Sequence, residues 1–527
     1  MGILLNPGGD RFQKSFRSEI YVDKSGMITY LNKIFNTENR FVCVSRPRRF
    51  GKSMAANMIA AYYDRTFDAQ ENFQRLQVAN DKSFSVHCGK YDVIQINMQD
   101  FLSRSKDIDG LLSLLQSRLL KELLKEYPDN DYVDATDLID TMNDIYAHNH
   151  RPFVIIIDEW DCIFREYGNK KSWQEKYLEF LRSWLKDKSY VGLAYMTGIL
   201  PIKKYGTHSA LNMFREFSME NPRELAKYVG FTSDEVKSLC NKYGRNFEEY
   251  RTWYDGYFFE GIGEVYNPHS IVEAVVSGIL DTYWNKTETF EALKIYLDLD
   301  MNGLKDIVIS LMAGEKRKIN TNNFSNDMTT FKSADDVLTL LIHLGYLGYD
   351  FASGSVFIPN QEIYREYANA ITDKSWSGVA LAIKSSENLL QATLAKDSQA
   401  VAKGIETAHL ETSHLQYNDE NALAYTISLA YYTARRKYIT IREFPAGKGF
   451  ADMIFLPRPN FVSLPALIIE LKWNKTAIGA IKQIKEKNYA LSLQDYVGEI
   501  LLVGINYEKS TRKHECVIET YEKRLLS

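Results

Sequence analysis

The chain has 527 residues, of which 45% are hydrophobic and 25% are charged, and its formal net charge is −4. This balance is typical of folded proteins and excludes a disordered or collagen-like chain. From the length we expect two to four domains. Because the net charge is slightly negative, no global positive field attracts nucleic acid, so any such site must be a local patch.

The five cysteines are scattered without C-x-x-C spacing, and we expect reduced thiols rather than disulfides or zinc ligands. The N-terminus has no apolar signal core, and no stretch approaches the ~20 apolar residues of a membrane span. We therefore expect no membrane partner and a cytoplasmic location.

The first specific motif in chain order lies in residues 41–54, FVCVSRPRRFGKSM. The apolar run at 41–44 predicts a strand, and residues 54–63 are compatible with a helix. A strand, a loop and a helix in this order form a phosphate-binding loop, in which backbone N–H groups and the helix dipole attract an anion. The candidate nucleotide-binding residues of this loop are Arg46, Pro47, Arg48, Arg49, Phe50, Gly51, Lys52, Ser53 and Met54.

Within this loop, Lys52 is expected to contact the β- and γ-phosphates of ATP, and the Ser53 hydroxyl is expected to bind Mg²⁺. Arg46 stands where the pattern G-x-x-x-x-G-K-[ST] has its first glycine. A Gly-Lys-Ser triplet also arises by chance, so nucleotide binding needs support from a second motif.

The second motif is FVIIIDEWD at residues 153–161. Its five apolar residues predict a strand buried on both faces, with Asp158 at the carboxyl end, where open α/β sheets bind their ligands. Asp158 can hold Mg²⁺ through water, and Glu159 can polarise the attacking water. The alternative is an Asp-Glu turn that only ends the strand.

The next strand along the chain is expected at residues 190–196 and ends at Thr197. Thr197 can contact the γ-phosphate or the attacking water, although a structural Thr-Gly turn explains the residue equally well. The repeated alternation of strands and helices through residue 198 predicts a parallel α/β sheet with helices on both faces.

From about residue 234 the pattern becomes helical. Residues 335–345 predict a helix, followed by strands near 346–349 and 356–358, an order that fits a winged-helix module. Because no basic cluster lies on this helix, we favour a packing or protein-contact role over DNA binding.

The third informative region is residues 418–491. A helix beginning near Glu420 is expected to precede a strand carrying Asp452 and a strand, LIIELKW, carrying Glu470 and Lys472. Residues i and i+2 of a strand share a face, so Glu470 and Lys472 can converge, and Asp452 joins them if its strand is adjacent. The carboxylates can bind Mg²⁺, and Lys472 can orient or deprotonate a water that attacks a phosphodiester. The alternative is a solvated strand face.

A final helix is expected over residues 476–491. We expect it to bury Ile478, Ile481, Ile484 and Leu491 and to display Lys482, Gln483, Lys485 and Lys487. Such a face suits a polyanion, although exposed helix lysines usually only increase solubility.

Several segments together resemble the predicted AAA-ATPase-like proteins of bacteria, which commonly carry a C-terminal domain of the PD-(D/E)xK nuclease superfamily. The nuclease-like part of this resemblance lies in GKGFADMIF (447–455) and IIELKW (468–473). Proteins of this family commonly have an arginine in place of the first loop glycine. The ATPase-like part lies in YVDKS (21–25), SRPRRFGKS (45–53), IIIDEWD (155–161), MTGI (196–199), WYDGYFF (253–259) and VYNP (265–268).

This resemblance implies a P-loop fold and a restriction-endonuclease-like fold. It implies that Asp158 is the Mg²⁺-linked acid and Glu159 the catalytic acid of the ATPase. In the nuclease-like part, Asp452, Glu470 and Lys472 match the core signature, Glu420 matches the helix acid, and Gln483 matches the residue that follows the core strands.

We therefore predict an α/β chain with a P-loop AAA-ATPase-like domain (1–230), a helical, winged-helix-like region (231–395) and a nuclease-like domain (396–527). The predicted function is ATP binding and hydrolysis coupled to a metal-dependent nuclease, with ATP and Mg²⁺ as cofactors and a nucleic acid as partner. The alternative is a nucleotide-switched binding or signalling protein with an inactive nuclease-like domain. Arg48 or Arg49 acting as an arginine finger in a homo-oligomer stays open.

Overall fold

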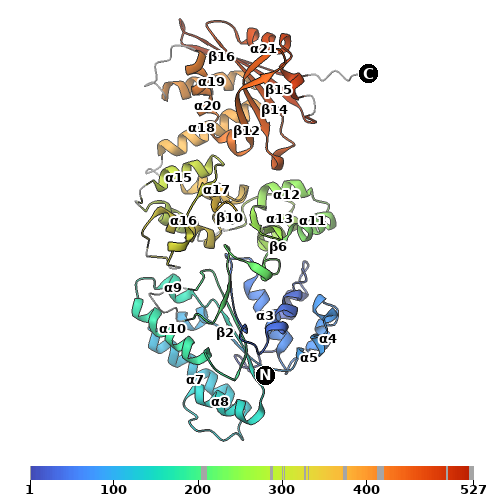
Figure 1. Cartoon of the computed structure of the whole chain (residues 1–527), viewed down its shortest axis with the longest axis vertical. Helices are drawn as coiled ribbons and strands as arrows, with labels where there is room; N and C mark the ends of the chain where they lie inside the picture. Colours follow the sequence, from blue (N-terminus) through green and yellow to red (C-terminus); the bar gives the residue numbers. More distant parts are fainter. Residues whose placement is uncertain are drawn as a thin grey trace. The chain divides into compact units, whose positions relative to one another are not determined.

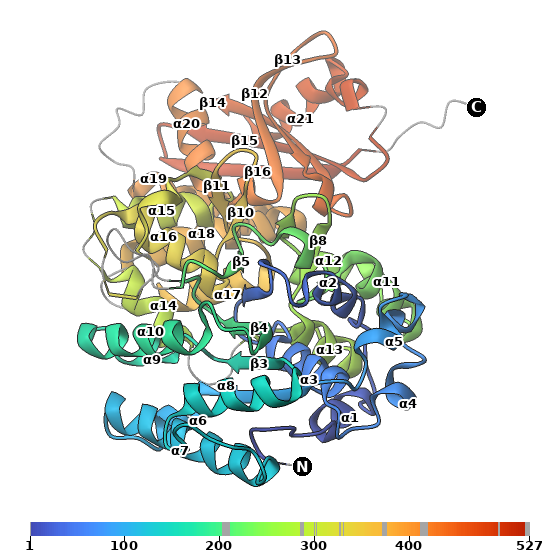
Figure 2. The same ribbon diagram turned by 60° about the horizontal axis from the view of Figure 1, so that its bottom comes forward.

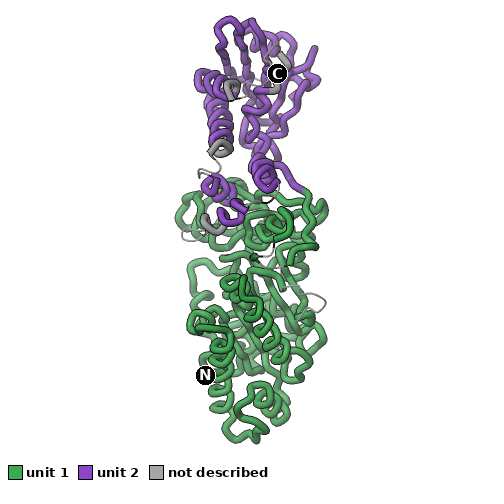
Figure 3. The backbone as a smooth tube through the Cα atoms, turned by 90° about the vertical axis from the view of Figure 1, so that its left-hand side faces the viewer, with its two compact units in different colours: residues 1–286, 318–362 green, residues 287–317, 363–527 purple. Residues whose placement is uncertain are grey.

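The computed structural model describes residues 2–202, 211–284, 289–299, 301, 303–325, 328–329, 331–371, 377–411, 420–493 and 496–521. These residues form two compact units, coloured separately in Figure 3. The first unit comprises residues 1–286 and 318–362, and the second comprises residues 287–317 and 363–527. The predicted domain boundaries at 230 and 395 stay a prediction.

The first unit is built on a five-stranded sheet in the order β2-β3-β4-β1-β5, in which all neighbours are parallel. The central strands are apolar runs buried on both faces, as a parallel sheet covered by helices requires. The carboxyl ends of parallel strands meet at one edge, so the residues after β1, β3 and β4 lie close together. The strands are β1 (Phe41–Ser45), β2 (Asp92–Asn97), β3 (Phe153–Asp158), β4 (Val191–Gly198) and β5 (Arg215–Phe217).

Helices cover both faces of this sheet, which confirms the predicted α/β architecture; Figure 1 shows α3 on one side and α7 and α10 on the other. In α7, leucines at every fourth position form the buried stripe, and Asp107 caps the helix by accepting from Gly110 N at 2.7 Å. The helices of this part are α1 (Asp10–Phe16), α2 (Gly26–Ile34), α3 (Lys52–Tyr63), α4 (Ala69–Phe73), α5 (Phe84–His87), α6 (Met98–Ser103), α7 (Ile108–Glu126), α8 (Leu138–Asn149), α9 (Cys162–Glu166) and α10 (Lys171–Leu185).

A second layer of the first unit combines a three-stranded sheet, in the order β6-β8-β7, with three short helices. Its core gathers aromatic and aliphatic side chains around Tyr250, Tyr254 and Tyr266. Thr232 and Glu235 form a capping box at the start of α11. The elements are β6 (Phe231–Thr232), α11 (Ser233–Lys242), α12 (Phe247–Tyr254), β7 (Tyr257–Phe259), β8 (Gly263–Tyr266) and α13 (Pro268–Ser277).

The predicted helix, strand, turn and strand near residue 340 are confirmed as α16 (Ala334–Leu344), β10 (Gly348–Asp350) and β11 (Ser355–Phe357). Gly345 ends α16 with φ of +88°, a left-handed conformation that favours glycine. The neighbouring elements are β9 (Arg317–Lys318) and α17 (Gln361–Ala370).

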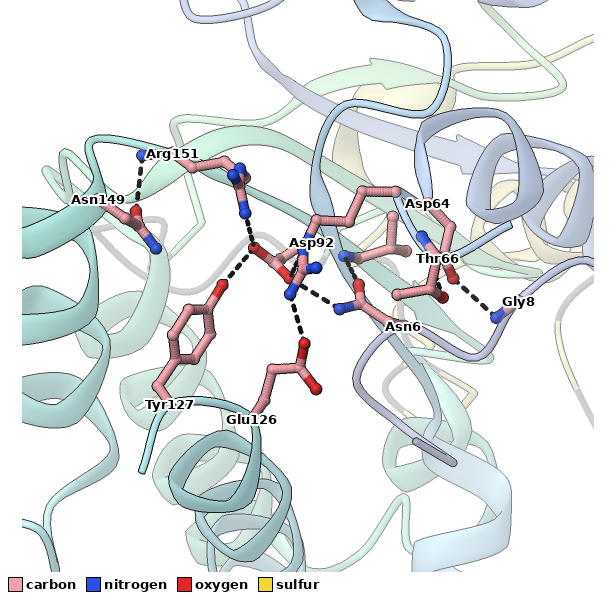
Figure 4. A network of polar contacts seen from close by, with 11 residues as sticks. Asn6, Gly8, Asp64, Thr66, Asp92, Glu126, Tyr127, Asn149 and Arg151 are labelled. Carbon is pink, nitrogen blue, oxygen red and sulfur yellow. Dashed lines mark hydrogen bonds and ion pairs between the residues drawn. The ribbon is translucent and has the colours of Figure 1, made fainter. Parts of the chain in front are cut away.

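A buried carboxylate ties the N-terminal segment to the amino end of β2, as the close-up in Figure 4 shows. Asp92 accepts hydrogen bonds from Asn6 Nδ2 at 2.7 Å, Arg65 Nε at 2.8 Å and Tyr127 Oη at 2.6 Å. Arg151 approaches the same carboxylate at 3.4 Å. The network lies at the end of β2 opposite to the loop edge, so its role is structural.

The second unit contains a five-stranded sheet in the order β12-β13-β14-β15-β16. Only β14 and β15 are parallel within it, so this is the mixed sheet expected for a nuclease-like α/β domain. Figures 1 and 2 both show α19 and α20 on one face of the sheet and α21 on the other, and each face has its own hydrophobic core. The strands are β12 (Tyr438–Ala446), β13 (Gly449–Pro457), β14 (Ala466–Trp473), β15 (Ile500–Glu508) and β16 (Lys513–Thr520).

The last helix is shorter than the expected span of 476–491, and part of its predicted buried face is wrong. Ile481 and Ile484 are buried, but Ile478 is 70% exposed and Leu491 is 52% exposed. Thr476 is the N-cap, and Asn488 adopts φ of +55°, which stops the helical path before Leu491. The helices of the second unit are α14 (Thr289–Leu297), α15 (Leu304–Met312), α18 (Ser377–Leu394), α19 (Ser398–Glu411), α20 (Glu420–Ala430) and α21 (Ala477–Glu486).

Within the described ranges, no helix is long and apolar enough to cross a membrane.

Candidate nucleotide site and candidate nuclease-like site

The loop after β1 ends at Gly51, which has φ of +91° and is the N-cap of α3. A left-handed conformation at this point favours glycine, because a Cβ would strain the backbone. Gly51 has no side chain that could cap α3. The first N–H groups of the helix are therefore available to an anion, as a phosphate-binding loop requires.

The Lys52 side chain is buried and turns back onto its own loop. Its Nζ donates to Arg46 O at 3.0 Å and to Pro47 O at 2.9 Å. Burial lowers the pKa of Lys52, while Glu159, Asp161 and Asp158 oppose this shift. The ammonium group is thus held by loop carbonyls and lies in the field of the acids at the end of β3.

A cavity of about 520 Å³ opens in front of this loop, a size that suits a nucleotide. Its wall is formed by several parts of the first unit: the N-terminal segment around Tyr21, the loop with the start of α3, Glu159 after β3, the segment around Tyr228, and the start of α13 with His269. Arg49 contacts the ring of His269 across this wall. The predicted site residues that line the cavity are Arg48, Arg49, Phe50, Gly51, Lys52, Ser53, Met54 and Glu159.

Arg46 and Pro47 contribute to the site through their backbone carbonyls and do not line the cavity. The buried guanidinium of Arg46 donates to Phe217 O at 2.8 Å and lies 5.0 Å from the ring centre of Phe259. Burial lowers the pKa of Arg46 to about 10. This residue therefore braces the loop against β5 instead of facing a phosphate.

The ends of β3 and β4 bring Asp158 and Thr197 together. Thr197 Oγ1 donates to Asp158 Oδ1 at 2.7 Å, and both residues are buried. Neither side chain lines the cavity itself, whereas the neighbouring Glu159 does. Asp158 also accepts from Glu159 N at 3.1 Å.

Glu159 leaves the strand in a left-handed conformation, with φ of +54°. Its carboxylate forms a hydrogen bond and an ion pair with Arg165. Burial raises the pKa of Glu159, and the charges of Lys52 and Arg165 oppose that rise.

Two residues that contact the segment after β3 and β4 were not predicted from the sequence, Asp161 and Arg165. Asp161 is fully buried and accepts from Ile199 N at 2.9 Å and Leu200 N at 2.8 Å, just beyond β4. Arg165 lies 3.3 Å from the same carboxylate. The four-residue spacing of Asp161 and Arg165 was the available signal, because side chains at i and i+4 meet on a helix.

In the second unit, the predicted acid pair and lysine come together. The register that pairs Met453 with Ile469 places Asp452 opposite Glu470 when continued by one residue. Asp452 Oδ2 accepts from Leu471 N at 2.7 Å. Lys472 Nζ donates to Glu470 Oε1 at 2.9 Å and to Leu471 O at 2.8 Å.

Glu470 is 1% exposed, and burial together with Asp452 raises its pKa to about 7. Gln483, on α21, donates to Glu470 Oε1 and contacts Tyr489 Oη at 3.2 Å, so the predicted Gln483 joins the site and Tyr489 is an addition. Glu470 Oε2 is buried and has no hydrogen-bond partner within the described part of the chain. An oxygen of this kind fits a divalent cation.

The described residues include no third acid that gathers with Asp452 and Glu470. Glu420 begins α20, but its side chain lies outside the described residues. Among the residues whose placement is described, no group of three or more His, Cys, Asp and Glu side chains gathers as a metal site.

Two parts of the chain match known protein families. Residues 10–207 match a family described as Predicted AAA-ATPase, and residues 419–516 match the PD-(D/E)XK nuclease superfamily. The chain therefore combines an AAA-ATPase-like part with a nuclease-superfamily part. Both matches confirm the resemblance found in the sequence motifs.

Individual relatives are distant. An "uncharacterized protein in vnfD 5'region" of Azotobacter chroococcum is 22% identical over an alignment of 513 residues, and the match covers 93% of this chain and 93% of that one. The ORC2 protein of Aeropyrum pernix aligns with 11% identity and a TM-score of 0.28 over 70% of this chain and 97% of that one. Cdc6p of Pyrobaculum aerophilum aligns with 8% identity and a TM-score of 0.25 over 69% and 96%. Both TM-scores lie below 0.5, so neither likeness defines the fold.

Proposed function

We propose that the first unit binds and hydrolyses ATP in the cavity before α3. The observation that carries this proposal is that Lys52, Ser53 and Glu159 line one cavity at the carboxyl edge of a parallel sheet. This edge is where such sheets hold nucleotides. The match to a predicted ATPase family over residues 10–207 supports the same reading.

Each residue has a role that follows from its position. Lys52 exchanges the carbonyls of Arg46 and Pro47 for phosphate oxygens, because an anion satisfies a buried ammonium better than neutral carbonyls do. The free N–H groups of α3 bind the same phosphates. Glu159 orients the attacking water from the rim of the cavity.

The residues also fit a magnesium ion. Ser53 lies in the first turn of α3, and Asp158 at the end of β3 supplies carboxylate oxygens, the ligand type that Mg²⁺ prefers. When bound, the ion neutralises charge on the phosphates. Thr197 holds the Asp158 carboxylate in place.

We propose that the second unit binds a nucleic acid and cleaves its phosphodiesters at Asp452, Glu470 and Lys472. Glu470, through its unpartnered Oε2, and the opposing Asp452 are the residues that would hold a divalent cation. Such an ion polarises a phosphate and activates a water. Lys472, held by Glu470, would orient that water.

Purified full-length chain tests the ATPase proposal. We expect Lys52→Ala to abolish ATP hydrolysis by removing phosphate binding and Glu159→Gln to abolish it while ATP still binds. Lys106→Ala is the matched control, because Lys106 is exposed and lies outside the cavity. Unchanged hydrolysis in Lys52→Ala would contradict the proposal.

A cleavage assay with single- and double-stranded DNA and RNA, in Mg²⁺ or Mn²⁺, tests the nuclease proposal. We expect Asp452→Ala and Lys472→Ala to lose cleavage and the exposed-site variant Lys509→Ala to retain it. Cleavage that persists in both site variants would come from a contaminant or another site.

A second candidate function is a nucleotide-switched binding protein whose nuclease-like domain does not cleave. It is favoured by Lys472, which is buried and whose Nζ already donates to Glu470 and to Leu471 O. ATP-dependent binding of nucleic acid without strand scission, over several metals, would support this version. The cytoplasmic location, a homo-oligomer and an arginine finger from Arg48 or Arg49 stay predictions.

A further inference from the structure

The side chain that contacts Glu159 belongs to Arg165, on the short helix α9. Arg165 has 11% of its side-chain surface exposed. Its terminal nitrogen donates to Glu159 Oε2, and its Nε lies 3.3 Å from Asp161 Oδ2. One guanidinium therefore links two carboxylates that follow β3.

Asp161 makes this link rigid. Its carboxylate is fully buried and accepts from the backbone N–H groups of Ile199 and Leu200, the residues directly after β4. Those contacts fix Asp161 to the edge of the sheet, where its negative charge attracts the guanidinium of Arg165 as an ion pair without a hydrogen bond to Nε in the described part of the chain. Arginine suits this position because its donors are arranged in a fixed fork, unlike the point charge of lysine.

Glu159 needs an external support. Its side chain has 24% of its surface exposed, at the rim of the cavity, and its backbone has the left-handed φ of +54°. A glutamate side chain without a partner samples many rotamers, and fixing one of them costs conformational entropy. A pre-formed contact with Arg165 removes that cost before a nucleotide arrives.

We propose that Arg165 is a positioning residue for ATP hydrolysis, which holds the carboxylate of Glu159 at the phosphate end of the cavity. The inference rests on the proposed ATPase function. Arg165 does not line the cavity, so it acts through Glu159 and not through the nucleotide. This separates its role from that of Lys52 and from that of an arginine finger.

Steady-state kinetics of Arg165→Gln test this role. We expect kcat for ATP hydrolysis to fall about 10- to 100-fold, because a small displacement of a catalytic group has an effect of this size. The KM for ATP and the affinity for a non-hydrolysable ATP analogue should change less than about twofold, since the phosphate-binding groups are intact. Arg165→Lys should recover part of kcat by restoring a positively charged donor.

Two further variants separate positioning from general damage. In a Glu159→Gln background, Arg165→Gln should leave the affinity for the non-hydrolysable ATP analogue unchanged, because Arg165 acts through Glu159 and not through the nucleotide. Arg104→Gln is the matched control, since Arg104 forms an exposed ion pair with Asp100 outside the cavity. Its kcat should equal that of the unmodified chain.

Three results would overturn the inference while the ATPase proposal stands: an unchanged kcat in Arg165→Gln, a raised kcat, or a weakened affinity for the analogue with kcat unchanged. A raised kcat would mean that the ion pair keeps Glu159 away from water. Absence of hydrolysis by the unmodified chain would instead overturn the proposed function, and the inference with it.

Discussion

At the residue scale, the nucleotide site shows what a motif can and cannot predict. The sequence predicted Lys52 and Glu159 because phosphate chemistry demands these residue types in a fixed strand context. It did not predict that Arg46 braces β5, because this depends on the carbonyl of Phe217, 171 residues away. Asp161 was missed for a similar reason, because its backbone partners Ile199 and Leu200 follow β4. Arg165 was missed although its partners Glu159 and Asp161 lie within six residues of it in the sequence.

Gly51 is a residue whose conformation, rather than its surroundings, limits substitution. A Cβ at this position would meet nothing within 4 Å, but the backbone φ is +91°. We expect Gly51→Ala to lower the free energy of unfolding by about 1–2 kcal/mol through strain alone and to weaken ATP binding by displacing the first N–H groups of α3. Thermal unfolding and a binding titration measure the two effects.

Gly244 offers a matched control for that substitution. It has φ of +64° and equally open surroundings, but it lies outside the cavity. Gly244→Ala should lose similar stability and no ATP affinity. If both variants bind ATP as the unmodified chain does, the geometry of the loop is not what binds the phosphates.

Asp255 is a buried acid whose protonation couples stability to pH. Burial and the neighbouring Glu264 raise the pKa of Asp255 to about 9, and Arg251, 3.7 Å away, opposes this only in part. The folded state therefore holds a proton that the unfolded state releases at lower pH. The stability linked to this proton is present in acid and is lost as pH rises through the folded pKa.

Replacing this acid with its amide removes the titration. We expect Asp255→Asn to be stabilised relative to the unmodified chain as pH rises from about 6 to 8.5, by up to about 1.4 kcal/mol per pH unit. Denaturant unfolding at several pH values measures this difference. A difference that stays constant with pH would show that Asp255 is ionised in the folded state.

At the element scale, the strands were predictable and the helix ends were not. Apolar β-branched runs predicted β1, β3 and β14 to within about a residue, because a strand that is buried on both faces is a nearly continuous run of hydrophobic residues. The extent of α21 was mispredicted, because Leu491, seven residues after Ile484, continues a helical pattern that the left-handed Asn488 interrupts. Periodicity detects a face but does not locate its end.

The Asp92 network fastens one element, the N-terminal segment, to the sheet (Figure 4). We expect Asp92→Ala to lower the free energy of unfolding by about 2–4 kcal/mol, because Arg65 and Asn6 lose a buried acceptor. ATP affinity should be unchanged, since Asp92 begins β2 at the edge away from the loop.

Asp100→Ala is the control for that change, as the Asp100 side chain forms an exposed ion pair with Arg104. Chemical denaturation compares the two variants. A loss below about 0.5 kcal/mol in Asp92→Ala, similar to that of an ordinary surface change, would contradict a structural role for the network.

At the scale of the whole molecule, the chain carries a cavity with phosphate-binding geometry in one unit and an acid pair with a lysine in the other. The sequence predicted both centres, because each is built from residues close together in the chain or on neighbouring strands. It did not predict the division into the two compact units, since residues 318–362 fold with the first unit and residues 287–317 with the second. Which unit a segment joins depends on its packing against segments that are distant in the sequence, and local sequence patterns do not encode that packing.

The central claim is that Lys52 binds the phosphates of one ATP molecule and that Glu159 promotes the hydrolysis of the same molecule. Calorimetric titration of ATP and Mg²⁺ into the full-length chain, with turnover followed in the same samples, tests it most directly. We predict one ATP bound per chain, normal affinity without turnover in Glu159→Gln, and loss of binding in Lys52→Ala. ATP binding by Lys52→Ala with the affinity of the unmodified chain would contradict the account.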